Sequence, residues 1–211
     1  MALSDFSQMQ AAVAKWAWKE GDAKFLAAIP DFFALVENIV QYGEPGVEPL
    51  RVREMENTAT VTLTNGVGPL PDDYLEFRQV TDGSNPNRLL EPVDGWYGEE
   101  EFPWQGLGRA AYFAVNGTSI RTYPKSASNL TLAYYQKIPA LTQADPVNWL
   151  LTKAPNVYLF GALMQAAPYM REDERLGLFG QRFAAALNGL RSSDGMAKVA
   201  RAVARPRGVT P

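Results

Sequence analysis

Apolar residues recur at steps of three and four in the later part of the chain, from Asp145 to Arg191. Pro155 can occupy the first position of a helix, where its missing N–H is not needed, and it opens one such stripe. The charged stretch 171–175 separates this stripe from a second one. Two amphipathic helices with so short a connection bury their stripes only by packing face to face, so the pattern predicts a helical hairpin. The stripes consist of Val157, Phe160, Leu163, Met164, Ala167 and Met170, and of Leu176, Phe179, Phe183, Ala186, Leu187 and Leu190.

Helical spacing also marks the N-terminal end of the chain. A first helix is expected to have Ser4 or Asp5 as its N-cap and to stop at Gly21. Trp16 and the nearby Trp18 are interpreted as core and flank rather than as a ligand-stacking pair, because aromatic residues at helical spacing usually pack inside a fold. The predicted apolar face consists of Phe6, Met9, Val13 and Trp16.

A second helical pattern runs from Phe25 to Gly43 and contains Pro30. Proline has no N–H and its ring clashes with the preceding turn, so we expect a break there, either as a kink or as a new helix start. The pattern continues beyond the proline with Phe33, Val36, Ile39 and Val40.

In the middle of the chain the period changes to two. Thr58 to Thr64 alternates Thr with Ala, Val and Leu, and Asn65-Gly66 follows as a turn signal. Tyr74 to Val80 fits a strand, or a short helix that leads into one. Leu130 to Gln136 fits a further strand, with alternate residues facing core and solvent.

The clearest local prediction is a β-hairpin. Ala111 to Val115 and Thr118 to Tyr123 flank the dipeptide Asn116-Gly117. Asn-Gly tolerates the positive φ angles of a type I′ turn, so this turn type is expected here.

Together these patterns predict an α+β fold: a helical bundle built from both chain ends, an inserted antiparallel β subdomain and an extended C-terminal tail. The expected parts are the N-terminal helices (1–50), the β-rich subdomain (51–140), the helical hairpin (141–191) and a basic tail (192–211).

The composition removes most enzyme templates. The chain has no Cys and no His, and therefore no disulfide, no thiolate nucleophile and neither the commonest general base nor the commonest transition-metal ligand. No basic region precedes an apolar signal core, and no apolar run is long enough to cross a membrane. We expect a soluble protein made in the cytoplasm, without a cofactor and without a metal site built on Cys or His.

The formal charge of −3 is unevenly distributed. From Arg191 onward five basic residues stand against Asp194 alone, which gives this end +4 and leaves −7 for the rest of the chain. Such a tail can serve solubility only, or it can dock onto an acidic partner or nucleic acid.

The most enzyme-like stretch combines aromatic and acidic side chains, as carbohydrate-binding and glycosidase sites do. Consecutive glutamates do not face one another, however, and the surrounding glycines are typical of an irregular surface loop. A solvated loop, a protein-contact loop and a catalytic site therefore stay open as interpretations. The residues are Trp96, Tyr97, Glu99, Glu100, Glu101 and Trp104.

Two further motifs carry less information. Asp72 and Asp73 follow Pro71 and can in principle ligate a hard cation, but an Asp pair after proline is more often a turn or a helix cap. Gly66-Val67-Gly68 lacks the later glycine and lysine of a phosphate-binding loop.

Several short motifs after Leu70 form an ordered set. They are Leu70-Pro71-Asp72-Asp73-Tyr74-Leu75, the Asn-Gly hairpin, Leu132-Ala133-Tyr134-Tyr135-Gln136-Lys137-Ile138-Pro139-Ala140-Leu141, Asn148-Trp149-Leu150-Leu151, Pro155, Tyr158-Leu159-Phe160 and Ala162-Leu163. In this order they resemble the tailed-phage head-to-tail adaptor proteins, the ring-forming neck proteins related to the podovirus tubular tail A protein.

The resemblance implies a structural virion protein without catalytic residues. It implies a homo-oligomeric ring of about twelve copies that joins the portal to a downstream tail or nozzle protein. The ring would surround the channel through which DNA leaves, with only non-specific proximity to the DNA and no contact with a membrane. Such a protein belongs to the neck of the virion and is assembled in the host cytoplasm.

Many such adaptors dock onto the portal through a C-terminal extension. The resemblance makes Lys198, Arg201, Arg205 and Arg207 the candidate docking residues here. The loop with Trp96, Tyr97 and Trp104 is expected to contact a neighbouring subunit or the next ring, because a lone subunit gains little from a long loop rich in aromatic residues. The alternative is a carbohydrate-binding or carbohydrate-active protein that uses loop 96–104.

Overall fold

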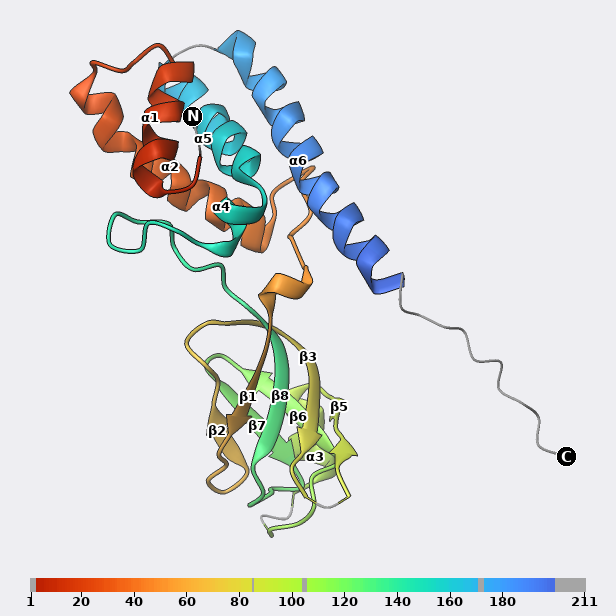
Figure 1. Cartoon of the computed structure of the whole chain (residues 1–211). Helices are drawn as coiled ribbons and strands as arrows, with labels where there is room; N and C mark the ends of the chain where they lie inside the picture. The colour runs from red at the N-terminus through yellow and green to blue at the C-terminus, as the bar shows by residue number, and fades with distance from the viewer. Residues whose placement is uncertain (1–2, 85, 104–105, 171–172, 200–211) are drawn as a thin grey trace, which may run out of the picture. The chain divides into compact units, whose positions relative to one another are not determined.

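The computed structural model describes residues 3–84, 86–103, 106–170 and 173–199. The chain divides into two compact units, a helical unit (Met1–Glu54 and Ile138–Pro211) and a β unit (Met55–Lys137) (Figure 1). Helices from the two chain ends pack together in the helical unit, so the predicted α+β class is confirmed.

Helix α5 (Pro155–Met170) lies at the centre of the helical unit and starts at the predicted proline. It packs against α1 (Phe6–Trp16), α2 (Ala23–Tyr42), α4 (Trp149–Lys153) and α6 (Asp173–Val199). The single apolar stripe predicted for α5 understates its burial. Buried residues occur on all its sides, as expected for a helix with neighbours all round.

Helix α6 packs back along α5, which confirms the predicted helical hairpin. Leu176, predicted in its apolar stripe, is instead 37% exposed, because it lies in the first turn, close to the end of the hairpin. The helix continues past Arg191, and Asp194 is buried there, with its Oδ1 2.8 Å from Arg53 Nε. The rest of the predicted stripe packs inward, with Phe179, Phe183, Leu187 and Leu190 buried.

Three helices meet at Gly161 of α5. A Cβ at this position would lie 2.7 Å from a methyl carbon of Val36 in α2 and 3.0 Å from the ring of Phe183 in α6. Only glycine permits this approach without displacement of a neighbour. Phe183 is completely buried at this junction, so the apolar stripe of α6 is core, as predicted.

The ends of the N-terminal helices agree only in part with the predictions. Asp5 is the N-cap of α1, and its Oδ1 accepts a hydrogen bond from the Gln8 N–H at 2.9 Å. Gly43, with φ of +79°, ends α2 as expected. The predicted stop of α1 at Gly21 is wrong, because Trp18 adopts a φ of +56° and turns the chain earlier.

Of the two outcomes expected at Pro30, the new helix start is wrong, since α2 continues through the proline. Pro30 has no N–H to donate to the carbonyl of Leu26, four residues earlier. The side chain of Gln10 in α1 donates to that oxygen instead, at 2.9 Å. A neighbouring helix thus replaces the missing backbone hydrogen bond.

A buried polar network joins α2 to the chain beyond the β unit. Glu37 Oε1 accepts hydrogen bonds from the Tyr158 hydroxyl and the Leu141 N–H, both at 2.7 Å. Asn148 Nδ2 donates to the Tyr158 hydroxyl at 2.7 Å, and Asn148 Oδ1 accepts from the Leu151 N–H at 2.9 Å. Burial raises the pKa of Glu37, although both of its hydrogen bonds favour the ionised form. Burial and the nearby Glu37 charge raise the pKa of Tyr158.

The β unit has two four-stranded sheets with the orders β1-β8-β3-β4 and β2-β7-β6-β5. The strands pair antiparallel, as predicted, except for the short parallel pair β5–β6. Both sheets contribute to one core that includes Val80, Phe113 and Leu132. After the short 3₁₀ helix Arg53–Met55, the strands are β1 (Glu56–Val61), β2 (Val67–Pro69), β3 (Tyr74–Asp82), β4 (Arg88–Leu89), β5 (Glu91–Pro92), β6 (Tyr112–Asn116), β7 (Ser119–Tyr123) and β8 (Leu130–Gln136).

The two Asn-Gly dipeptides form different turns. Asn65 and Gly66 both have positive φ, 52° and 78°, as a type I′ turn requires. The predicted β6–β7 hairpin is present, but its type I′ turn is wrong. Asn116 pairs with Ser119, so Gly117 and Thr118 are the central residues, and only Gly117 has a positive φ, +59°, as in a type II′ turn.

Tyr134 of β8 anchors the start of β3 in the β unit. Its hydroxyl donates to Asp73 Oδ1 at 2.8 Å and accepts from Asn57 Nδ2 at 3.2 Å. Burial and the Asp73 carboxylate raise the pKa of Tyr134 to about 12. The hydroxyl therefore stays protonated and acts as a fixed donor.

Candidate assembly surfaces

The stretch predicted as an irregular loop forms a helix, α3 (Gly95–Glu101). Asp94 caps it by accepting the Trp96 N–H at 2.9 Å. A Cβ at Gly98 would lie 2.4 Å from the ring of Tyr123 in β7, whose hydroxyl donates to the Gly95 carbonyl at 3.2 Å. The glycines that suggested a loop instead let α3 lie directly on the β7 strand.

The aromatic residues of α3 face solvent. Trp96 is 71% exposed and Tyr97 47% exposed. Trp96 borders an open hollow of about 520 Å³ that is also lined by Phe77 and Asn116. Trp104, the third residue predicted for this contact surface, lies outside the described residues. The packing of α3 thus holds two exposed aromatic side chains on a fixed support.

The glutamates of α3 do not form a paired acid site. Successive residues of a helix point about 100° apart, so neighbouring carboxylates diverge. Glu99 forms an ion pair with Arg121 of β7, while Glu100 and Glu101 are exposed. A glycosidase needs two carboxyl groups that face each other across the substrate, and these three do not meet that requirement.

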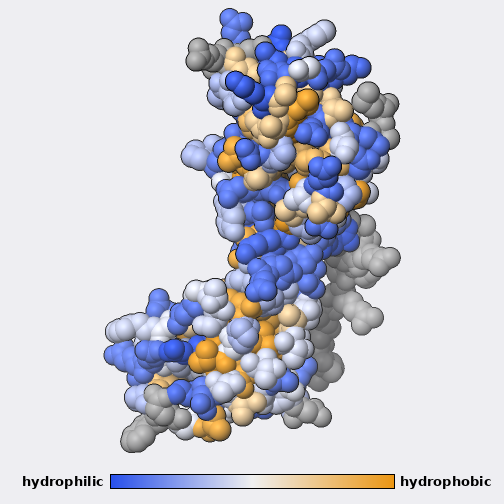
Figure 2. Space-filling view, turned by 90° about the vertical axis from the view of Figure 1, so that its left-hand side faces the viewer, coloured by the Kyte–Doolittle hydropathy of each residue, from blue (hydrophilic) through white to orange (hydrophobic). Residues whose placement is uncertain are grey.

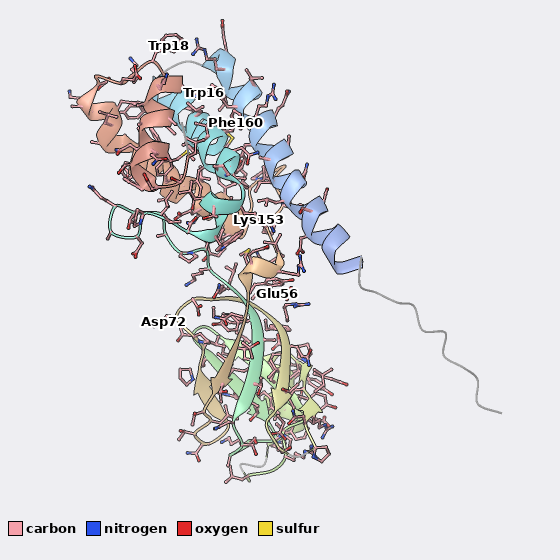
Figure 3. The ribbon with its side chains drawn as sticks, viewed as in Figure 1. Trp16, Trp18, Glu56, Asp72, Lys153 and Phe160 are labelled. Carbon is pink, nitrogen blue, oxygen red and sulfur yellow. The ribbon has the colours of Figure 1, made fainter. Side chains whose placement is uncertain are left out.

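The tryptophans at the end of α1 form a second exposed aromatic surface (Figure 3). Their predicted place in and beside the core is wrong, because Trp16 is 50% and Trp18 84% exposed. Trp16 keeps one edge-on contact with Phe160 of α5, at 5.9 Å between ring centres. Lys15 and Glu20 border a groove of about 320 Å³ between the indoles. Charged residues flank the two tryptophans in the sequence, and this pattern could have predicted that the indoles are exposed.

The predicted portal-docking residues are only partly covered by the structure. Lys198 belongs to α6, but its side chain lies outside the described residues, as do Arg201, Arg205 and Arg207. Asp194, the single acid at this end of the chain, is buried against Arg53. The Asp194 carboxylate therefore forms its ion pair within the helical unit.

Asp72 and Asp73 form a turn before β3. Asp73 binds the Tyr134 hydroxyl, and its carbonyl accepts the Lys137 N–H at 2.7 Å. The Asp72 carbonyl accepts from Lys137 Nζ at 3.1 Å. Among the described residues, no group of three or more acidic side chains is arranged to hold a metal ion.

None of the helices in the described part of the chain combines the length and apolar character that a membrane span requires.

Both units carry exposed aromatic residues on a packed support, and such residues are enriched where proteins contact one another. The chain belongs to the SU10 adaptor protein family, whose model matches residues 4–207. This is a family of phage head-to-tail adaptors, so the resemblance seen in the sequence is confirmed, and the chain is a structural protein of the phage virion. The comparison with curated proteins finds no match.

Proposed function

We propose that copies of this chain form a ring that joins the portal to the downstream tail or nozzle protein and surrounds the DNA exit channel. The observation that carries the proposal is the family match, which extends over both units. The role is structural rather than catalytic. A closed ring uses two different faces of each subunit, and about twelve copies are expected.

In this proposal α3 is a contact between subunits or between rings. Trp96 and Tyr97 are large and exposed, and α3 is fixed by Gly98 against Tyr123. Aromatic side chains that are already held in place lose little conformational freedom on binding and are enriched at protein interfaces.

The C-terminal tail docks onto acidic groups of the portal. Arg201, Arg205 and Arg207 follow α6, whose last turns are held to the helical unit by Arg53 and Asp194. Exposed ion pairs are screened over about 8 Å at physiological ionic strength, so docking should weaken as salt rises. The competing role for these arginines is contact with DNA phosphates in the channel, without sequence preference.

A pulldown with portal rings free of DNA tests this docking. The assay compares the full chain with a deletion variant that lacks residues 200–211. A deletion from Ser192 onward is unsuitable, because it also removes Asp194 and its contact with Arg53. The full chain should bind, and the deletion should abolish binding without changing the melting temperature. A deletion variant that binds the portal as well as the full chain would rule out docking by the tail.

The same assay tests the wider proposal. The full chain and the portal should form a complex whose mass corresponds to a ring of adaptor on the portal ring. Failure of the full chain to bind the portal at low ionic strength would contradict the proposed function. Replacing Arg201, Arg205 and Arg207 with Gln removes the charges and keeps the length of the tail. Binding of this variant to the portal therefore shows the contribution of the charges alone.

A further inference from the structure

Two helices present outer faces that carry few charges. On α2 the exposed residues beyond Lys24 repeat at helical spacing and include Leu35 and Tyr42, 49% and 57% exposed. Apolar residues on this side of the helical unit lie among polar ones in Figure 2. Asp31 is the only charged residue of this stripe, and α2 is described throughout. The stripe consists of Ala27, Pro30, Asp31, Ala34, Leu35, Asn38 and Tyr42.

The outer face of α6 has a matching stripe. Exposed residues recur there at steps of four and three, the spacing at which helices pack side by side. Leu178 is 54% exposed, and a Cβ at Gly189 would have nothing within 4 Å in its own chain. Arg182 is the charged residue within this stripe, and Arg175, three residues before Leu178 and also exposed, continues it toward the start of α6. The stripe consists of Leu178, Arg182, Ala185, Gly189 and Ser192.

The two stripes belong to different sides of the helical unit. Helix α5 packs against both α2 and α6, and Figure 1 shows α1 and α2 on one side of it and α6 on the other. Neither Asp31 nor Arg182 has an ion-pair partner among the described residues. Asp31 on one side of the unit and Arg182 on the other are thus available to pair with groups of another chain.

We infer that the outer face of α2 packs against the outer face of α6 in the next copy of this chain, with Asp31 close to Arg182. This inference rests on the proposed ring and names the surfaces that build it. A ring contact joins two different faces of neighbouring subunits, which these two stripes provide. The opposite charges of Asp31 and Arg182 favour this contact over one that brings Asp31 against Asp31 or Arg182 against Arg182. The small residues on α6 allow a second helix to approach closely.

Thiol cross-linking tests the pairing, because the natural chain has no cysteine. The variant with Asp31→Cys and Arg182→Cys, assembled on portal rings and treated with a short bis-maleimide, should give a ladder of covalent oligomers larger than a dimer. Each single-cysteine variant should give no ladder, and a mixture of the two should stop at dimers. Rings that form without a ladder would overturn this interface and leave the proposed function intact. No ring formation by the natural chain would overturn both.

Charge reversal gives an independent test that does not depend on cross-linker reach. Asp31→Arg and Arg182→Asp should each reduce ring formation on the portal about tenfold, and the double variant should restore it. Asp145→Arg, which reverses an exposed acid outside both stripes, is the matched control and should form rings as the natural chain does. Melting temperatures should agree among all four variants. Single reversals that assemble normally would contradict the contact.

Discussion

The helical unit and the β unit are assembled from the chain in different ways. The β unit uses one uninterrupted stretch, Met55–Lys137, whereas the helical unit is formed by residues on both sides of that stretch. Contacts between distant residues hold the helical unit together, including Glu37 with Tyr158 and Arg53 with Asp194. Such contacts must offset the entropy lost when a long intervening segment is closed into a loop. A few long-range interactions therefore contribute more to the stability of the helical unit than to that of the β unit.

Each unit also contains a buried tyrosine whose hydroxyl donates to a carboxylate. The Glu37 acceptor of Tyr158 is only 6% exposed, whereas the Asp73 acceptor of Tyr134 is partly accessible to solvent. An unsatisfied group is costly in proportion to its isolation from water. The two tyrosines thus form a natural pair for comparison.

The largest effect is expected from Phe183→Ala. Phe183 is completely buried where α2, α5 and α6 meet, so its removal leaves a cavity at the centre of the helical unit. We expect a loss of about 3 to 5 kcal/mol in the free energy of unfolding. Urea denaturation followed by circular dichroism measures it. A loss below about 1 kcal/mol would mean that the three-helix junction contributes little to the unit.

The tyrosine pair should give a smaller, unequal effect. Tyr158→Phe removes one hydrogen bond each from the buried Glu37 and Asn148, which keep the Leu141 N–H and the Pro139 carbonyl as partners, and should lower stability by about 1 to 3 kcal/mol. Tyr134→Phe should lower it by about 0.5 to 1.5 kcal/mol, because Asp73 and Asn57 can bind water instead. Equal losses in the two variants would refute the role assigned to burial of the carboxylate.

The pH dependence of stability should carry a signature of Glu37. Burial raises the folded-state pKa of this carboxyl above its ordinary value of 4.5, so the folded protein binds its proton more tightly than the unfolded chain does. The contribution of Glu37 to stability is then full below pH 4.5 and is lost as pH rises through the folded-state pKa. Measured against Glu37→Gln, the natural chain should lose relative stability over that interval. A relative gain with rising pH would reverse the assigned direction.

The smallest effect on stability is expected at the exposed aromatic residues. Trp18→Ser and Trp96→Ser should each change the free energy of unfolding by less than about 0.5 kcal/mol, because neither indole is packed in a core. Differential scanning fluorimetry measures the melting temperature, and assembly on the portal is scored in parallel. The Trp96 variant should melt normally and assemble poorly. A marked drop in its melting temperature would assign the indole to the stability of the β unit.

Local patterns predicted the elements that depend on neighbouring residues. Pro155 at the start of α5, the apolar stripe of α6 and strand β8 follow from periodicity and from proline's missing N–H. The β6–β7 hairpin was also predicted, but its register shifted the turn by one residue to Gly117. Register depends on pairing across the strands, which a dipeptide signal does not contain.

The failures occur where distant parts of the chain decide the outcome. Pro30 does not start a new helix within α2, and Gln10 of another helix binds the freed carbonyl. The α3 segment is helical because Asp94 caps it and Gly98 fits against Tyr123. Neither partner is visible from periodicity. For the candidate surfaces, the sequence correctly placed Trp96 and Tyr97 outside the core but misplaced the two tryptophans of the N-terminal region.

Electron microscopy of the intact particle neck tests the central claim most directly. The account predicts a closed ring of this chain between the portal and the tail, with the DNA channel through its centre. The outer face of α2 in each copy should lie against α6 of the next. Density for the chain at any other place in the particle, or a neck without a ring that contains both the helical unit and the β unit, would contradict the account.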